Sequence, residues 1–151
     1  MTKAVKVILI AVIAVVLLVA LVLGVMVGLG IYGWKAAMRS GNEAATVQHL
    51  KTIHAVELQY YNTHKLNFGT FDQLVADEML AKRFSGATPI VDGYIFTLRL
   101  TAASSGQSAS FTVNADPQTS DTGTNHFYMS STDGTIRVNK DRPAGPADSP
   151  L

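Results

Sequence analysis

The feature that most constrains this chain is a run of 28 residues, from Val7 to Trp34, that contains no charged side chain. As an α-helix rising 1.5 Å per residue, this run would be ~42 Å long, against roughly 30 Å for the hydrocarbon core of a bilayer. A secretory signal peptide has a shorter apolar region, of about 7 to 15 residues, before a cleavage site with small residues. We therefore expect residues 1–34 to form a retained transmembrane helix anchor that contacts the lipid bilayer.

The remaining composition excludes several classes of function. Residues 35–151 carry ten of the basic and all eleven of the acidic side chains, which leaves this part near neutrality. A nucleic-acid-binding protein presents clustered basic residues, whereas Lys82 and Arg83 are the only adjacent basic pair. The chain has no cysteine, so it has no disulfide, thiol nucleophile or thiolate metal site. Its fold must rest on packing, and its length allows one modest hydrophobic core.

Two helices are expected after the anchor. Between Asn42 and His64, apolar residues recur at steps of three and four, which predicts a helix with one core-facing side. A single glycine costs a helix only about 1 kcal/mol, so Gly41 permits either a break or one long bent helix that begins in the membrane. Further along, Thr70 and Gln73 form a capping box. It predicts a short helix over residues 71–81, with Phe71, Leu74, Val75 and Leu80 facing inward.

From Tyr94 onward the apolar period changes to two, which indicates half-buried strands. We expect strands over residues 94–100, 111–115, 127–130 and 135–138. The last two would be joined across Asp133 and Gly134, a dipeptide favoured where both turn residues have positive φ. Residues 140–151 are rich in proline and small polar residues and predict a flexible tail. The expected fold is α+β, with the helix packed on a small antiparallel sheet of about four strands in a domain over residues 35–139.

Four segments, in order, resemble type IV pilins and type II secretion pseudopilins. Residues 42–53 resemble the helix just beyond the membrane in that family, and residues 68–74 resemble the Gly-Thr-aromatic segment that follows it. Residues 93–98 resemble the first strand, and residues 127–137 the closing hairpin. The resemblance implies a non-enzymatic structural subunit that assembles with itself or with related pilin-like subunits. It also implies an anchor in the bacterial inner membrane, with a periplasmic or extracellular C-terminal domain.

The N-terminus departs from the family pattern and leaves a second interpretation open. It has no recognisable prepilin cleavage motif, and the first acidic residue is Glu43, far beyond the apolar run. Burying an unpaired lysine in a filament core is costly, and Lys3 and Lys6 lie where a filament would bury apolar surface. The alternative is a single-pass anchored binding module that does not polymerise. The slight excess of positive charge before the run, compared with Lys35 and Arg39 after it, predicts a cytoplasmic N-terminus.

Candidate contact residues follow from spacing. Ala20, Gly24 and Gly28 recur at four-residue steps and would form a helix-association face. The side chains expected in the core between helix and sheet are Val47, Leu50, Ile53, Tyr60, Tyr61, Phe96 and Leu98.

We expect no catalytic residue, cofactor or metal, and a small-molecule substrate is not favoured. The four histidines are not spaced to share a face of one element, and no nucleophile elbow or phosphate-binding loop is present. Asp116, Asp121 and Asn125 lie in one loop region and could supply oxygen ligands to calcium. That loop lacks the dense carboxylates of a strong site, so a plain polar loop is the preferred interpretation.

Overall fold

The computed structural model describes residues 3–151. The chain divides into two compact units, with bounds Met1–Ala37 and Met38–Leu151. The helix α1 (Lys3–Thr63) contributes residues to both units. The helix therefore continues through Gly41, and the single-helix alternative is confirmed. It ends where Lys65 and Leu66 adopt left-handed backbone angles, with φ of 55° and 62°. Such angles cost an L-residue roughly 1–2 kcal/mol, so this turn is a point of local strain.

The second helix, α2 (Phe71–Ala76), begins as expected but is shorter than predicted. The Thr70 hydroxyl accepts a hydrogen bond from the Gln73 amide, and the Gln73 side chain accepts one from the Thr70 amide. The prediction that this helix reaches residue 81 is wrong, because Glu78 has a φ of 58° and turns the chain. That turn returns Leu80 to the core, and a short 3-10 helix, η1 (Lys82–Phe84), follows.

Within residues 3–151, the strands form one antiparallel sheet whose spatial order follows the chain order. The strands are β1 (Ile90–Val91), β2 (Tyr94–Thr101), β3 (Ser110–Pro117), β4 (His126–Ser130), β5 (Arg137–Asn139) and β6 (Ser149–Pro150). The prediction of an α+β fold with a long helix on an antiparallel sheet is confirmed. The predicted count of about four strands is wrong, because the two edge strands have only two residues each. Strands this short are too brief to show an alternating pattern.

The connection between β4 and β5 differs from the tight turn that was expected. Gly134 has a φ of 63°, but Asp133 is not among the residues with positive φ. The Asp133 carboxylate instead accepts hydrogen bonds from the Thr135 amide at 3.1 Å and from the Arg137 guanidinium at 2.8 Å. These bonds stabilise a longer loop, so β5 begins at Arg137 and not at Thr135.

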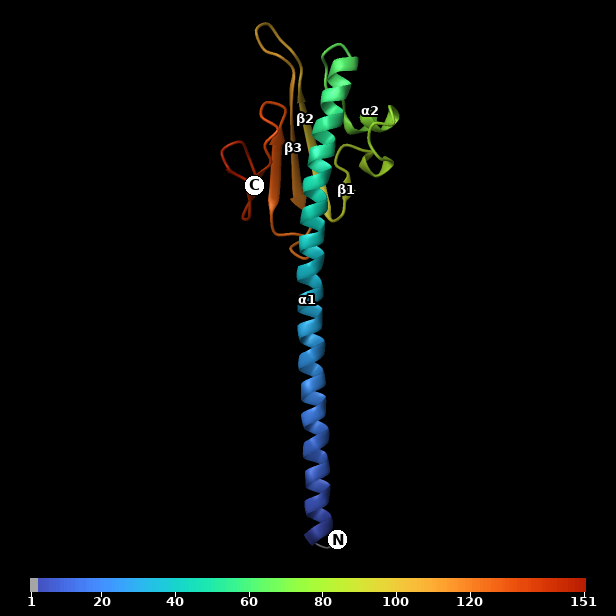
Figure 1. The fold of residues 1–151 in the computed structure, drawn as a ribbon, viewed down its shortest axis with the longest axis vertical. Helices are drawn as coiled ribbons and strands as arrows, with labels where there is room; N and C mark the ends of the chain where they lie inside the picture. The colour runs from blue at the N-terminus through green and yellow to red at the C-terminus, as the bar shows by residue number, and fades with distance from the viewer. Residues whose placement is uncertain (1–2) are drawn as a thin grey trace. The chain divides into compact units, whose positions relative to one another are not determined.

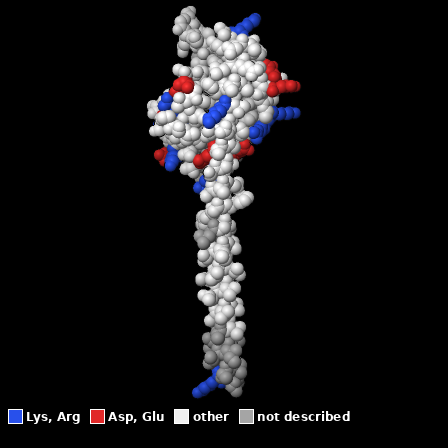
Figure 2. All heavy atoms as spheres, in the orientation of Figure 1, with Lys and Arg blue, Asp and Glu red and all other residues white. Residues whose placement is uncertain are grey.

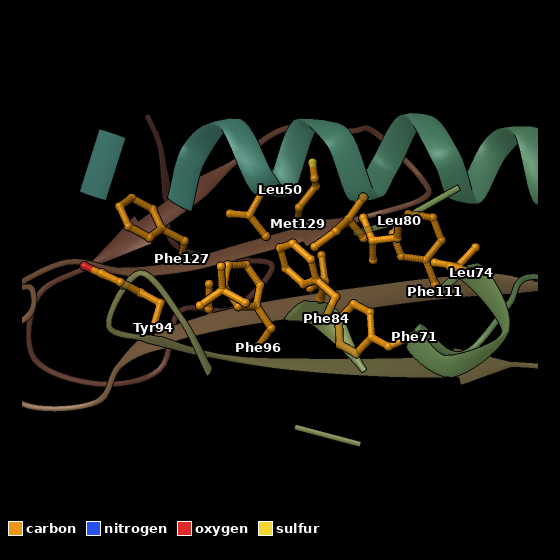
Figure 3. Close-up of a cluster of buried hydrophobic side chains, with 14 of the residues drawn as sticks. Leu50, Phe71, Leu74, Leu80, Phe84, Tyr94, Phe96, Phe111, Phe127 and Met129 are labelled. Carbon is orange, nitrogen blue, oxygen red and sulfur yellow. The ribbon is translucent and has the colours of Figure 1, made fainter. Parts of the chain in front are cut away.

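The core lies between one face of the sheet and the part of α1 in the second unit (Figure 1, Figure 3). Among the residues expected there, four are buried: Leu50, Ile53, Tyr60 and Phe96. Val47 and Leu98 are partly buried and pack against that core. Tyr61 is half-buried, with its ring stacked on Phe68 at 4.6 Å between centroids. Large aromatic rings fill the space between the two layers, where Phe84 and Phe96 meet edge to face at 5.4 Å.

The C-terminal segment is packed against the domain, so the expectation of a flexible tail is wrong. Ala144 is buried, and its carbonyl accepts a hydrogen bond from the Asn114 amide group at 2.8 Å. The Asp148 carboxylate accepts bonds from Asn139, Arg142 and the Gly145 amide, at 2.8–3.1 Å. Composition suggested flexibility, but these specific polar contacts order the segment and let β6 pair with β5.

Replacing Asn114 with alanine should loosen this segment. The change removes the donor that holds the buried Ala144 carbonyl, and such a loss costs about 1 kcal/mol. Hydrogen exchange of the Gly145 amide should accelerate by about fivefold. Thr112→Ala, at the neighbouring position on the same face of β3, is the control and should leave this exchange unchanged. Equal exchange in wild type and Asn114→Ala would contradict the proposed attachment.

Candidate functional site

The first unit is dominated by exposed apolar side chains. From Val12 to Val27 every side chain is exposed, and Tyr32 and Trp34 are exposed further along. Figure 2 shows no charged atoms on the drawn apolar part of α1 and many on the second unit. By length and composition, α1 is long and apolar enough to span a membrane.

The structure places the expected helix-association residues on this apolar part of α1. Ala20, Gly24 and Gly28 follow one another at helical steps of four. A Cβ atom added at Gly24 or Gly28 would meet nothing within 4 Å. Small residues at this spacing let a second helix approach the backbone closely, so this face leaves room for such a contact.

In the second unit, a carboxylate on α1 holds the loop between β3 and β4. Glu43 accepts hydrogen bonds from the Thr124 amide at 2.7 Å, the Asn125 amide at 3.2 Å and the Asn125 side chain at 2.6 Å. Asn42 adds a bond from its side chain to the Thr122 carbonyl at 2.9 Å. We call this group of contacts the helix–loop clamp. The partners of Glu43 lie about 80 residues away in the chain, so no local sequence pattern indicates this role.

Tyr94 and Gly123 complete the clamp beneath the loop. The Tyr94 hydroxyl donates to the Asn125 carbonyl at 2.9 Å. Burial, together with the nearby carboxylates of Glu43 and Asp116, raises the pKa of Tyr94 above its usual range, which keeps the hydroxyl protonated as a donor. A Cβ at Gly123 would overlap the Tyr94 ring, so only glycine fits at this position.

The three residues that could supply oxygen ligands to calcium each contact a different partner. Asp116 lies 2.6 Å from His126, Asp121 lies 3.6 Å from Arg39, and the Asn125 side-chain amide donates to Glu43. Over the described residues 3–151, no three His, Cys, Asp or Glu side chains converge as metal ligands. The observed contacts hold this loop through hydrogen bonds to α1.

The histidines are also separated from one another. His49 lies 2.7 Å from Asp92, His64 lies 3.2 Å from Asp77, and His126 pairs with Asp116. The His54 ring packs near Phe111, with 5.9 Å between centroids. Each ring therefore has its own local partner, and the fold does not bring them together as a ligand set.

Glu57 is the most unusual polar residue in the core. The buried positions of α1 include Thr46, Leu50, Ile53 and Tyr60, and Glu57 lies on the same stripe, fully buried. Its Oε2 atom accepts a hydrogen bond from the Gly69 amide at 2.9 Å, while its Oε1 atom is buried without a hydrogen-bond partner. Glu57 was not among the residues expected in the core, although its spacing of seven residues from Leu50 places a carboxylate at a core position.

The burial of Glu57 changes its acidity. Removal from water raises the pKa of this carboxyl from 4.5 to about 7, although the Gly69 amide opposes the shift. Gly69 lies beside the ring of Tyr60, where a Cβ would come within 3.1 Å of the ring. Glu57 therefore joins α1 to the strained turn before α2 through a group that can titrate near neutral pH.

Comparison with protein families, with curated proteins and with solved structures found no match for this chain. Over residues 3–151, the polar groups described here hold loops and helices together. The apolar part of α1 presents the largest set of exposed apolar side chains.

Glu57→Gln should make stability less dependent on pH. The folded protein keeps the Glu57 proton up to about pH 7, whereas the unfolded chain releases it near pH 4.5. Folding therefore takes up a proton between these values, and the wild type loses stability as pH rises through this window. The shift corresponds to about 3 kcal/mol. Urea unfolding of the full chain in detergent micelles, followed by near-ultraviolet circular dichroism, measures both proteins at each pH.

The comparison isolates Glu57 because every other titrating group is common to the two proteins. The free energy of unfolding of Glu57→Gln should exceed that of the wild type increasingly as pH rises from 4.5 to 8. Parallel pH profiles for the two proteins would show that the carboxyl is not held in its neutral form.

Proposed function

We propose that this protein is a non-enzymatic, membrane-anchored structural subunit, pilin-like or pseudopilin-like, of a cell-envelope assembly of the type IV pilus or type II secretion type. The observation that carries the proposal is that one helix, α1, contains both an apolar segment and the helical layer of the α+β domain. Its first part is an exposed apolar segment long enough to span a bilayer. Its last part supplies the helical layer of the α+β domain through Leu50, Ile53 and Tyr60.

The positions of the four family-like segments support this proposal. Residues 42–53 lie in the part of α1 that packs on the sheet, and residues 68–74 lead into α2. Residues 93–98 form the start of β2, and residues 127–137 run from β4 into β5. The segments therefore occupy successive elements of one domain, in the order that the resemblance implies.

The alternative function is a single-pass anchored binding module that does not polymerise. Lys3 lies at the start of α1, ahead of the apolar segment, and is exposed. In a filament this part of the helix would be packed among other subunits, where an unpaired ammonium group is costly. A module that stays among lipids can instead extend the lysine side chain to the headgroup region.

The proposed location is the bacterial inner membrane, with a cytoplasmic N-terminus and the second unit in the periplasm or outside the cell. This orientation is the one that the resemblance implies, and it places Lys3 and Lys6 on the cytoplasmic side of the membrane. Tyr32 and Trp34, both exposed, are of the kind that lies at the membrane interface.

Cell fractionation tests the subunit proposal against the alternative. If the protein enters a filament, shearing of intact host cells should release it into the high-speed pellet of the medium. A non-polymerising module should remain with the membranes after the same treatment. An integral membrane protein of the same cells is the control for lysis. Recovery solely with membranes would exclude the proposed filament. Recovery in the soluble fraction would exclude the proposed membrane anchor as well.

The helix-association face allows a second test of assembly. Gly24→Leu and Gly28→Leu place large side chains where the backbone is now open to a partner helix. Each change should reduce crosslinking between neighbouring anchors severalfold. Val25→Leu, one position around the helix from Gly24, is the control for apolar bulk and should leave crosslinking unchanged. Undiminished crosslinking in both glycine variants would show that the helices meet through another face.

A further inference from the structure

One edge of the sheet is only partly covered. The edge strand β1 pairs with Tyr94 and Ile95 of β2, whereas β2 itself runs for eight residues. A further bond joins the Phe96 amide to the Pro89 carbonyl at 2.9 Å. Beyond Phe96, no further backbone hydrogen bond joins the described chain before β1 to β2. The edge of β2 from Leu98 to Thr101 is therefore open.

The register identifies which backbone groups face this opening. In an antiparallel sheet, successive residues direct their amide and carbonyl groups to alternate sides of the strand. Phe96 directs its amide toward β1, so Leu98 and Leu100 direct their amides and carbonyls the same way. In the described part of the chain, no other group is bonded to them. These unpaired groups form a template for one more strand.

The opposite edge of the sheet does not present such a template. There the outermost strand is β6, which has two residues, and Pro150 has no amide hydrogen to donate. Proline and short length are the usual protections of an edge against further pairing. The open part of β2 has neither protection, so the two edges differ in their capacity to accept a strand.

A pocket adjoins the open edge on the helix side of the sheet. It has a volume of about 240 Å³, and its lining combines the apolar residues Phe71, Ala87, Leu98 and Leu100 with the polar residues Thr70 and Asp72. A strand added to β2 would place the side chains opposite Leu98 and Leu100 on this same side of the sheet. Apolar side chains would therefore enter the pocket or cover the exposed part of Leu100.

On the other side of the sheet, the edge carries an unpaired charge. Arg99 lies between Leu98 and Leu100, is exposed, and has no ion pair or hydrogen bond among residues 3–151. A residue directly opposite Arg99 in an added strand would share its side of the sheet. Cross-strand pairs of opposite charge are favourable and like charges are unfavourable, so the partner residue should be acidic.

We propose that the edge of β2 from Leu98 to Thr101 binds an extended segment of another protein, with an apolar, an acidic and an apolar residue in succession. Such strand addition combines main-chain hydrogen bonds with pockets for alternate side chains. A second copy of this chain is a poor source of such a segment. Residues 56–58 fit the pattern, but Glu57 is buried within α1, and residues 115–117 fit it but are already paired within the sheet as part of β3. The edge belongs entirely to the second unit, so the proposal does not depend on polymerisation or on the anchor.

The probe for this proposal is the peptide acetyl-Ser-Thr-Val-Glu-Val-Thr-Ser-amide, carrying a fluorophore, titrated with the full chain in detergent micelles. In the expected register, the two valines exchange hydrogen bonds with Leu98 and Leu100, while the amide of the glutamate points away from β2. N-methylation of both valines should weaken binding at least tenfold. N-methylation of the glutamate alone, the matched control, should change the affinity by no more than about twofold.

Charge reversal tests the recognition of the acidic residue. Arg99→Glu should weaken binding of the glutamate peptide several-fold and make the peptide with lysine in its place the better ligand. Lys51→Glu makes the same charge change at an exposed position of α1 and should preserve the original order. Both sites are exposed, so the variants should remain folded, and the circular dichroism of the full chain checks this.

Three results would overturn the proposal. The first is no binding of the glutamate peptide at millimolar concentration. The second is equal loss of binding on N-methylation of the valines and of the glutamate, which would exclude pairing through the backbone in this register. The third is dimerisation of the chain alone that is lost in Arg99→Glu, which would make a second copy the occupant of the edge. Each readout is independent of cell fractionation, so the proposed function is tested separately.

Discussion

The second unit depends on one contact, the packing of a single side of α1 against the sheet. The stripe on α1 that includes Leu50, Ile53 and Tyr60 covers the inward residues of β2, β3 and β4. Without this helix, the aromatic face formed by Phe96, Phe111 and Phe127 would be exposed to water. An antiparallel sheet needs such a covering layer to bury its apolar side, and here that layer is part of the same helix that contains the apolar segment.

Two carboxylates on α1 connect this helical layer to the loops around it. Glu43 is partly exposed, and its bonds with backbone and side-chain amides hold the loop between β3 and β4. Glu57 is fully buried and holds the turn before α2 with a single bond. A charged acceptor that remains near water costs little, whereas a buried one favours its neutral form. Glu57 therefore attaches α1 to the turn before α2 through a group that titrates near neutral pH.

The two edges of the sheet differ in how well they are protected against pairing with a further strand. The C-terminal segment packs on the outer side of the sheet and contributes β6, and proline limits further pairing at that edge. At the opposite edge, β1 ends early and leaves Leu98 and Leu100 with unpaired backbone groups next to a partly apolar pocket. Within the described residues, the edge at β6 is protected and the edge of β2 is open, so the proposed strand addition has a defined position and register.

The sequence by itself determined the features that depend on neighbouring residues. The uncharged run, the apolar steps from Leu50 to Tyr60, the capping box at Thr70 and the alternation from Tyr94 are local patterns, and they gave the helices and the long strands. Tertiary structure alone decided the two short edge strands, the attachment of residues 140–151, and the partners of Glu43. These features depend on contacts between residues far apart in the chain, so no local sequence periodicity predicts them. Glu57 lies between the two cases, because its position on the apolar stripe is visible in the sequence, whereas its bond to Gly69 and its raised pKa arise only when the turn folds over it.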